Sequence, residues 1–151
     1  MKLNTTTARV LQSVAAYIRP AAPPRILVVD DEEGVRRFVA RVLSNAGYEV
    51  QVASGGTEAL EAADRGNVFD LVVTDVRMPS MSGPRFVAQL RQQGVEPKVL
   101  FLTGYNEQLF DERGTLWMDE AFLDKPCSVN GLLESVALLL TGHLGPAEPR
   151  H

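Results

Sequence analysis

The chain has 151 residues, with 15 Lys and Arg against 19 Asp and Glu, so its formal net charge at pH 7 is -4. From this length we expect one domain with a sizeable core and no separate output domain. The negative balance gives no general attraction to nucleic acid or to an anionic membrane, so we expect neither as a partner.

Cysteine and histidine are too scarce to support several common chemistries. Cys127 is the only cysteine, which excludes an intramolecular disulfide and a zinc site made of thiolates, as expected in a reducing compartment. Both histidines, His143 and His151, lie in a tail rich in Gly and Pro, so a Ser/His/Asp triad and a histidine-ligated metal are excluded from the folded part. Arg9 and Gln12 interrupt the apolar segment that a signal peptide needs, and no run approaches about 18 apolar residues, so we expect a cytoplasmic protein.

Residues 1–24 differ in character from the rest of the chain. Apolar residues recur at helical spacing between Val10 and Ile18, and the stiff, extended linker RPAAPP follows. A flexible or cloning-derived leader, a docking helix and the end of a preceding domain all fit this segment. We therefore divide the chain into an N-terminal extension at 1–24, a domain at 25–140 and a flexible tail at 141–151.

From Arg25 onward, short aliphatic runs alternate with helical patterns. Three of the runs are continuous, which is typical of strands that helices cover on both faces. Five such units predict a parallel sheet with right-handed crossovers. The predicted strands are Arg25–Val29, Tyr48–Ala53, Asp70–Asp75, Lys98–Thr103 and Ala121–Leu123.

Capping residues predict where several of the helices begin and end. Gly47 follows the first helical pattern at the place of a left-handed cap, and Gly66 and Gly94 follow the second and third. Ser82 and Ser128 are the expected N-caps of the third and last helices. The fourth helix, expected within residues 106–120, has the least regular pattern.

The first predicted strand runs directly into a group of acids. Its sequence, ILVVDDEEG, places Asp30, Asp31 and Glu32 immediately after four aliphatic residues. Like charges at the mouth of an apolar sheet lose hydration and repel one another, so they destabilise the fold unless a cation or a phosphate chemistry compensates.

The later strands also end in polar residues. The third ends at Asp75, the fourth at Thr103, and Lys125 and Pro126 follow the fifth. Taken singly, such an Asp is typical of a cap or turn, Thr103 of a strand end and Lys125 of a solvated surface. Ligands of parallel α/β sheets bind outside the carboxyl ends of the strands, so these groups should meet. Together they suit Mg²⁺ binding and phosphoryl transfer to a carboxylate.

Four motifs in this order, VVDDE, VTDVRMPSMSG, FLTGY and FLDKP, resemble the receiver domain of bacterial two-component response regulators, over about Arg25 to Leu140. The resemblance implies an α/β, flavodoxin-like (βα)5 three-layer sandwich whose five-stranded parallel sheet has the order 2-1-3-4-5. It implies a phosphoacceptor with Mg²⁺-dependent self-phosphorylation and autodephosphorylation rather than an enzyme. The implied partner is a sensor histidine kinase or a histidine phosphotransfer protein, and the segment after Tyr105 is similar to receivers attached to hybrid sensor kinases.

The same resemblance implies which residues hold the metal and accept the phosphoryl group. Asp75 is the implied phosphoacceptor. Asp30, Asp31 and Asp75 are the implied Mg²⁺ ligands, with Asp31 the more direct of the first two, and the backbone carbonyl of Arg77 completes the set.

The remaining implied roles concern phosphoryl binding and signalling. Thr103 and Lys125 are expected to contact phosphoryl oxygens, and the bond from Lys125 to Pro126 is expected to be cis. Thr103 and Phe122 are the implied switch residues. They serve an output surface formed by the fourth helix, the fifth strand and the last helix, through which a homodimer is also expected.

Two other classes of protein fit part of this pattern. Haloacid-dehalogenase-type phosphatases also form an aspartyl phosphate, but their general acid is an Asp two positions after the nucleophile, where this chain has Arg77. A pseudo-receiver would bind partners without phosphorylation, yet such proteins usually lose an acidic, threonine or lysine position, and none is missing here.

Overall fold

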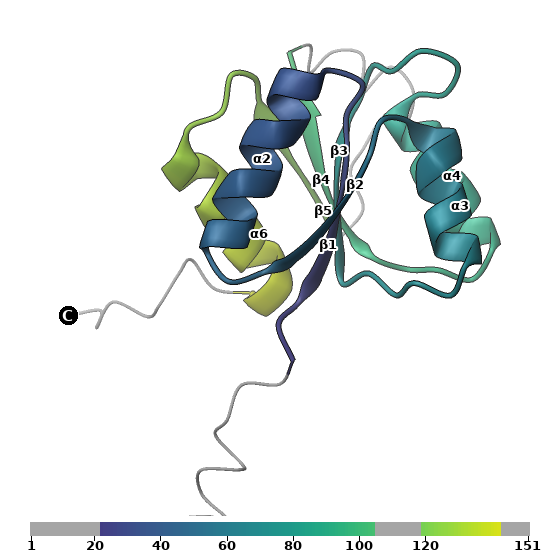
Figure 1. The fold of residues 1–151 in the computed structure, drawn as a ribbon, viewed down its shortest axis with the longest axis horizontal. Helices are drawn as coiled ribbons and strands as arrows, with labels where there is room; N and C mark the ends of the chain where they lie inside the picture. Colours follow the sequence, from purple (N-terminus) through teal and green to yellow (C-terminus); the bar gives the residue numbers. More distant parts are fainter. Residues whose placement is uncertain (1–21, 105–118, 143–151) are drawn as a thin grey trace, which may run out of the picture.

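The computed structural model describes residues 22–104 and 119–142. A parallel five-stranded sheet in the order β2-β1-β3-β4-β5 carries helices on both faces (Figure 1), which confirms the predicted strand order and the three layers. The strands are β1 (Arg25–Val29), β2 (Glu49–Ala53), β3 (Leu71–Asp75), β4 (Lys98–Thr103) and β5 (Glu120–Asp124). The helices are α2 (Glu33–Asn45), α3 (Gly56–Asp64), α4 (Gly83–Gln92) and α6 (Val129–Thr141).

The observed strands differ from the predicted ones by a residue at most at each end. β1 and β4 have the predicted bounds, whereas β2 and β3 begin one residue later and β5 is longer by one residue at each end. Tyr48 stays outside β2 because its N–H donates to the carbonyl of Leu43 (3.2 Å) and so closes the end of α2. Of the segment expected to form the fourth helix, residues 106–118 lie outside the described residues.

Alternate residues of the central strands fill two cores, one on each face of the sheet. In β1, Ile26 and Val28 pack on the side of α2 and α6, while Leu27 and Val29 pack on the side of α3 and α4. Figure 1 shows these two pairs of helices on opposite faces of the sheet. Double burial explains why β1, β3 and β4 contain continuous aliphatic runs.

The predicted caps are present where the chain enters and leaves the helices. Ser82 Oγ accepts a hydrogen bond from the N–H of Arg85 (3.3 Å), and Ser128 Oγ accepts one from the N–H of Gly131 (2.9 Å). Gly47, just beyond α2, has a φ of 98°, as expected for a left-handed cap. Across 22–104 and 119–142, no helix has the length and apolar character needed to cross a bilayer.

Helix α4 begins directly against the end of β3. The N–H of Gly83 donates to the carbonyl of Val76 (2.9 Å), and Gly83 is buried. A Cβ at this position would clash with the backbone carbonyl oxygen of Asp75, so only glycine allows this approach. The contact fixes the backbone of Asp75.

We expect Gly83→Ala to lower the free energy of unfolding by about 3 kcal/mol, because the added methyl group must displace backbone rather than a flexible side chain. Denaturant unfolding measures this loss. Gly34→Ala in α2 is the matched control, since a Cβ there meets nothing within 4 Å, and it should leave stability equal or slightly higher. Equal stability of the two variants would contradict the packing described here.

Candidate functional site

The carboxyl ends of the strands bring most of the predicted site residues to one edge of the sheet. Asp30 follows β1, Asp75 ends β3, Thr103 ends β4 and Lys125 follows β5. A cavity of about 210 Å³, which we call the acid cavity, opens there. Its lining residues are Asp31, Glu32, Asp75, Arg77, Thr103, Gly104 and Lys125.

Asp30 is buried just after the end of β1, with only 1% of its surface exposed. Its Oδ1 accepts a hydrogen bond from the N–H of Glu32 (2.9 Å), and its backbone carbonyl accepts one from the guanidinium of Arg36 (2.8 Å). Its Oδ2 is buried without a well-directed hydrogen bond, although Lys125 Nζ lies 3.0 Å away as an ion-pair partner. This oxygen is therefore available to a further cation.

Asp75 is the second buried carboxylate, at 6% exposure. Its Oδ1 accepts a long hydrogen bond from the N–H of Arg77 (3.4 Å), while its Oδ2 lies 3.1 Å from Lys125 Nζ. Its backbone carbonyl accepts a hydrogen bond from Thr74 Oγ1 (3.0 Å). The carboxylate is thus fixed at the floor of the cavity and still reachable from it.

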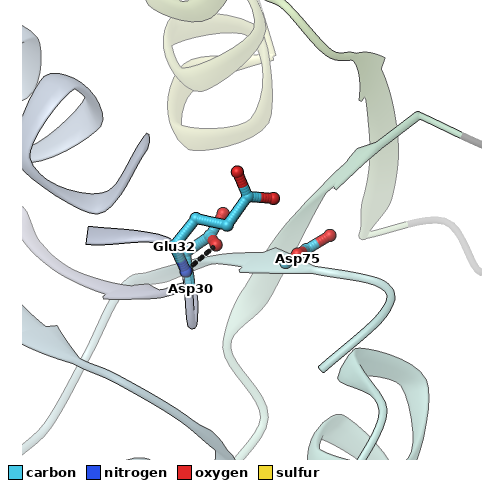
Figure 2. Close-up of side chains that lie close together, drawn as sticks. All are labelled: Asp30, Glu32 and Asp75. Carbon is cyan, nitrogen blue, oxygen red and sulfur yellow. Dashed lines mark hydrogen bonds between the residues drawn. The ribbon is translucent and has the colours of Figure 1, made fainter. Parts of the chain in front are cut away.

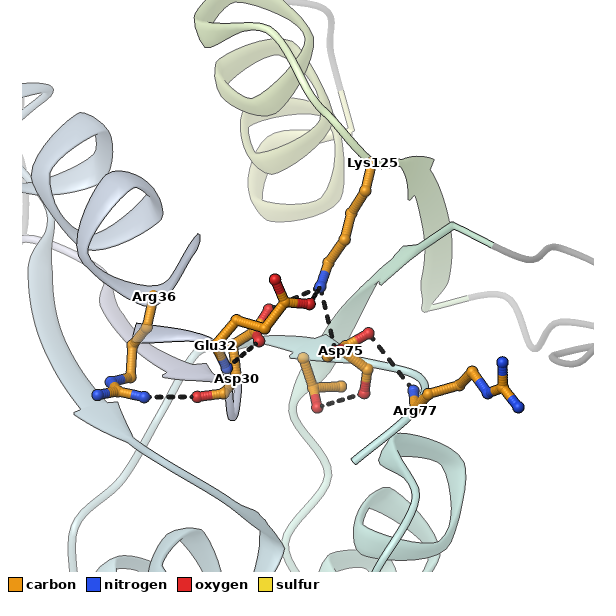
Figure 3. Close-up of polar contacts among 7 residues, drawn as sticks. Asp30, Glu32, Arg36, Asp75, Arg77 and Lys125 are labelled. Atoms are coloured by element: carbon orange, nitrogen blue, oxygen red, sulfur yellow. Dashed lines mark hydrogen bonds and ion pairs between the residues drawn. The ribbon is translucent and has the colours of Figure 1, made fainter. Parts of the chain in front are cut away.

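Lys125 reaches across the mouth of the site and pairs with three carboxylates at once (Figure 3). Its Nζ lies 3.0 Å from Asp30, 3.1 Å from Asp75 and 3.6 Å from Glu32. Its backbone N–H donates to the carbonyl of Thr103 (2.9 Å), and the following bond to Pro126 is cis, as predicted. This backbone hydrogen bond anchors the start of the loop after β5 to the end of β4.

Glu32, which the sequence placed in the acidic group but not among the expected ligands, joins the site as a partner of Lys125. Carboxylate oxygens of Asp30, Glu32 and Asp75 all lie within 4.8 Å of one another, and Figure 2 shows the three groups gathered at the strand ends. Asp31 is exposed and lines the acid cavity. The available signal was the third acid of ILVVDDEEG, one residue beyond the pair that the family resemblance singled out.

The environment opposes ionisation of the two buried acids. Burial raises the pKa of Asp75, the charge of Asp30 raises it further, and Lys125 only partly offsets this. Burial also raises the pKa of Asp30. For Lys125, burial alone would lower the pKa, but the pairs with Asp30 and Asp75 outweigh it, so its pKa is raised and the ammonium form is favoured.

The donor set suits a hard divalent cation. Three carboxylates and one ammonium leave two uncompensated negative charges, and Asp30 Oδ2 lacks a directed hydrogen bond. Mg²⁺ prefers oxygen ligands and needs only one or two carboxylates, because it keeps several waters. Arg77 places its backbone beside Asp75, whereas Figure 3 shows its side chain extending away from Lys125.

The two predicted switch residues lie in different places. Thr103 is buried at the end of β4 and lines the acid cavity. Phe122 lies in β5 opposite Phe101 of β4 and does not line that cavity. Its neighbours Ala121 and Leu123 pack toward α2 and α6, so Phe122 faces the other side of the sheet.

A second cavity, which we call the apolar hollow, lies next to the acid cavity. Its volume is about 550 Å³, and most of its lining is apolar. Glu32 and Lys125 line both cavities. The residues around the hollow are Glu32, Gly34, Val35, Phe38, Lys125, Pro126 and Cys127.

Comparison with known proteins gives consistent matches. Residues 26–137 match the response regulator receiver domain. The chain is 38% identical over 116 residues to the sensor kinase CckA of Brucella abortus and 39% identical over 120 residues to the response regulator MprA of Mycolicibacterium vanbaalenii. These matches cover 76% and 78% of this chain but only 12% of CckA and 51% of MprA.

Solved structures give the same result. The chemotaxis protein CheY4 of Vibrio cholerae superposes with a TM-score of 0.72 at 34% identity, covering 79% of this chain and 100% of that one. The receiver domain of the hybrid histidine kinase CckA superposes with a TM-score of 0.66 at 36% identity, covering 78% and 99%. These identities extend the likeness beyond the fold to the sequence.

We expect metal-free Asp75→Asn to melt several degrees above the wild type at pH 7.5, with a smaller gap at pH 5. A carboxyl whose pKa is raised by folding binds its proton more tightly in the folded state, so wild-type stability falls as pH rises through the unfolded and then the folded pKa. Calorimetry in a chelating buffer measures the gap. Asp70→Asn, at the opposite end of β3, is the control. A gap that narrows with rising pH would contradict the electrostatic account.

Proposed function

Because the chain belongs to the response regulator receiver domain family, we propose that it is the phosphoacceptor of a two-component phosphorelay and takes its phosphoryl group onto Asp75. The observation that carries this proposal is the position of the Asp75 carboxylate, which lies on the acid cavity and 3.1 Å from the Lys125 ammonium. A buried nucleophile beside a fixed positive charge is what transfer of an anionic group to a carboxylate requires.

The transfer itself needs little from the protein beyond position and charge. An oxygen of ionised Asp75 attacks phosphorus, the bond from phosphorus to the donor's imidazole nitrogen breaks, and that nitrogen keeps the electron pair. Lys125 then exchanges a carboxylate oxygen for a phosphoryl oxygen, a short movement because its Nζ already lies at Asp75. The Thr103 hydroxyl, buried at the cavity wall, is proposed to receive another phosphoryl oxygen.

Mg²⁺ is the proposed cofactor. Asp30 and Asp75, Asp31 and the backbone carbonyl of Arg77 would hold it. When bound, the ion offsets the negative charge that the arriving phosphoryl group adds. Support comes from the all-oxygen donor set and from Asp30 Oδ2, the buried oxygen that lacks a directed hydrogen bond.

A phosphohistidine on a sensor kinase or a histidine phosphotransfer protein is the proposed donor, in the cytoplasm. The apolar hollow adjoins the acid cavity, so a donor helix seated there would bring its histidine within reach of Asp75. Phe38 supports this docking because 39% of its surface is exposed at the hollow although it is a large apolar residue.

The downstream response is proposed to pass through Thr103 and Phe122. Thr103 is one strand away from Phe122, whose partner in the sheet is Phe101. A change at the hydroxyl on phosphorylation would therefore reach an aromatic side chain of β5 that is partly exposed. Binding of a protein partner, or formation of a homodimer, at the face that includes β5 and α6 is the proposed output.

The proposed phosphoacceptor role has a direct chemical test. Incubation with Mg²⁺ and acetyl phosphate should add one phosphoryl group to the wild type, visible by intact mass as an acid-stable, base-labile adduct. Asp75→Asn should show no adduct, because the attacking oxygen is lost. Repeated turnover of a phosphoester would instead favour the phosphatase alternative, and a fully folded wild type that never forms the adduct would favour the pseudo-receiver.

Docking at the hollow is tested separately. We expect Phe38→Ala to slow transfer from a phosphorylated histidine phosphotransfer domain by roughly tenfold, which corresponds to about 1.4 kcal/mol of lost apolar contact. Phosphorylation by acetyl phosphate should be unchanged, because that donor does not use the hollow. Val68→Ala, which truncates a side chain 70% exposed elsewhere, is the control. Equal slowing with both donors would contradict docking at this site.

A further inference from the structure

The acid cavity and the apolar hollow are separated by one ion pair. Glu32 and Lys125 are the residues that line both, and Glu32 Oε1 lies 3.6 Å from Lys125 Nζ. Figure 3 shows the Glu32 side chain extending to the ammonium above the carboxylates of Asp30 and Asp75. Anything that fills the hollow therefore touches the pair that also bounds the phosphoacceptor cavity.

We propose that Glu32 is a positioning residue that shares the Lys125 ammonium with Asp75 in the resting protein, and that a protein donor seated in the hollow displaces Glu32 and leaves the ammonium to the incoming phosphoryl group. This inference rests on the proposed function and adds a gate to it. The gate links occupation of the docking surface to the availability of the charge that transfer needs.

Burial determines which of the three carboxylates can most easily separate from the Lys125 ammonium. Asp30 is buried and anchored by the N–H of Glu32, and Asp75 is buried at the strand end. The side chain of Glu32 is 63% exposed, and its distance to Nζ is the longest of the three. An exposed pair of this kind contributes little free energy, so a docking surface can break it at small cost.

The ion pair between Glu32 and Lys125 is expected to slow phosphoryl transfer. While Glu32 shares the ammonium, less of its positive charge faces the oxygen of Asp75 and the phosphoryl group that arrives there. A small phosphodonor, which does not fill the hollow, must react with the gate closed. Removal of Glu32 should therefore help small donors most.

Glu32 can be substituted without disturbing the helix that follows it. It is the N-cap residue of α2, yet its side chain makes no capping hydrogen bond. Glu33 provides a closely matched control, because its side chain is also 63% exposed and pairs with Arg37 (2.9 Å) rather than with Lys125. The two substitutions to Gln remove the same charge from neighbouring positions.

The test measures phosphorylation rates of the wild type, Glu32→Gln, Glu32→Asp and Glu33→Gln with Mg²⁺ and two small donors, acetyl phosphate and the less negative phosphoramidate. We expect Glu32→Gln to react about two- to fivefold faster with both donors, the range that loss of an exposed ion pair allows. Glu32→Asp keeps the charge but loses the reach and should be faster too. Glu33→Gln should match the wild type.

Several results would overturn the gate. A Glu32→Gln rate equal to or below that of the wild type removes it directly. Acceleration by Glu33→Gln as well, or acceleration confined to the more negative donor, assigns the effect to general charge repulsion. A Glu32→Asp rate equal to that of the wild type also removes it, because the charge alone would then suffice.

A second readout does not depend on phosphorylation. The chain has only three lysines, Lys2, Lys98 and Lys125, so the ¹⁵N ammonium resonance of Lys125 can be assigned by its loss in Lys125→Arg. In metal-free protein, Glu32→Gln should shift this resonance and Glu33→Gln should not. An unchanged resonance contradicts the gate alone, whereas a wild type that takes no phosphoryl group contradicts the proposed function.

Discussion

A single ammonium group, on Lys125, lies within ion-pair distance of three carboxylates that come from two different strand ends. One positive charge cannot balance three negative ones, and burial of Asp30 and Asp75 makes the imbalance costly, because desolvation raises both carboxyl pKa values. The resting site therefore carries a net negative charge that further positive charge would stabilise. This imbalance supports our proposal that the site binds a divalent cation, which would also offset the charge of an arriving phosphoryl group.

The fold holds these charged groups together at one edge of the sheet. Parallel strands joined by crossover helices bring the ends of β1, β3, β4 and β5 to one edge, and two cores hold the sheet from both faces. Gly83 lets α4 begin against the backbone of Asp75, and the Lys125 N–H bond to Thr103 anchors the loop after β5. These backbone contacts thus hold the acidic side chains together despite their mutual repulsion. The exposed side chain of Glu32 is the part of the cluster that we expect to move.

Much of this could be predicted from the sequence because the patterns are local. Continuous aliphatic runs gave strand bounds within one residue, and Ser82, Ser128 and Gly47 marked helix ends by their capping chemistry. Glu32 could not be predicted as a partner of Lys125, since that contact joins residues far apart in the chain and depends on where a long, exposed side chain turns. The apolar hollow was equally hidden, because Phe38 and Cys127 belong to different elements. The structure brings most of the predicted site residues together, but the chemical roles came from family resemblance and remain predictions for all of them: Asp30, Asp31, Asp75, Arg77, Thr103, Phe122 and Lys125.

The decisive measurement is Mg²⁺ binding to the metal-free protein. Calorimetric titration measures the affinity and the number of ions bound, and thermal unfolding measures the stability that the ion adds. We expect one ion per chain and a gain of about 1.4 kcal/mol in the free energy of unfolding at roughly ten times the dissociation constant, since the ion binds only the folded state. Asp30→Asn should lose most of this response, whereas Asp70→Asn should keep it. A wild type whose stability does not change with Mg²⁺, or an Asp30→Asn protein that responds as the wild type does, would show that the charge imbalance at Asp30 does not create a metal site.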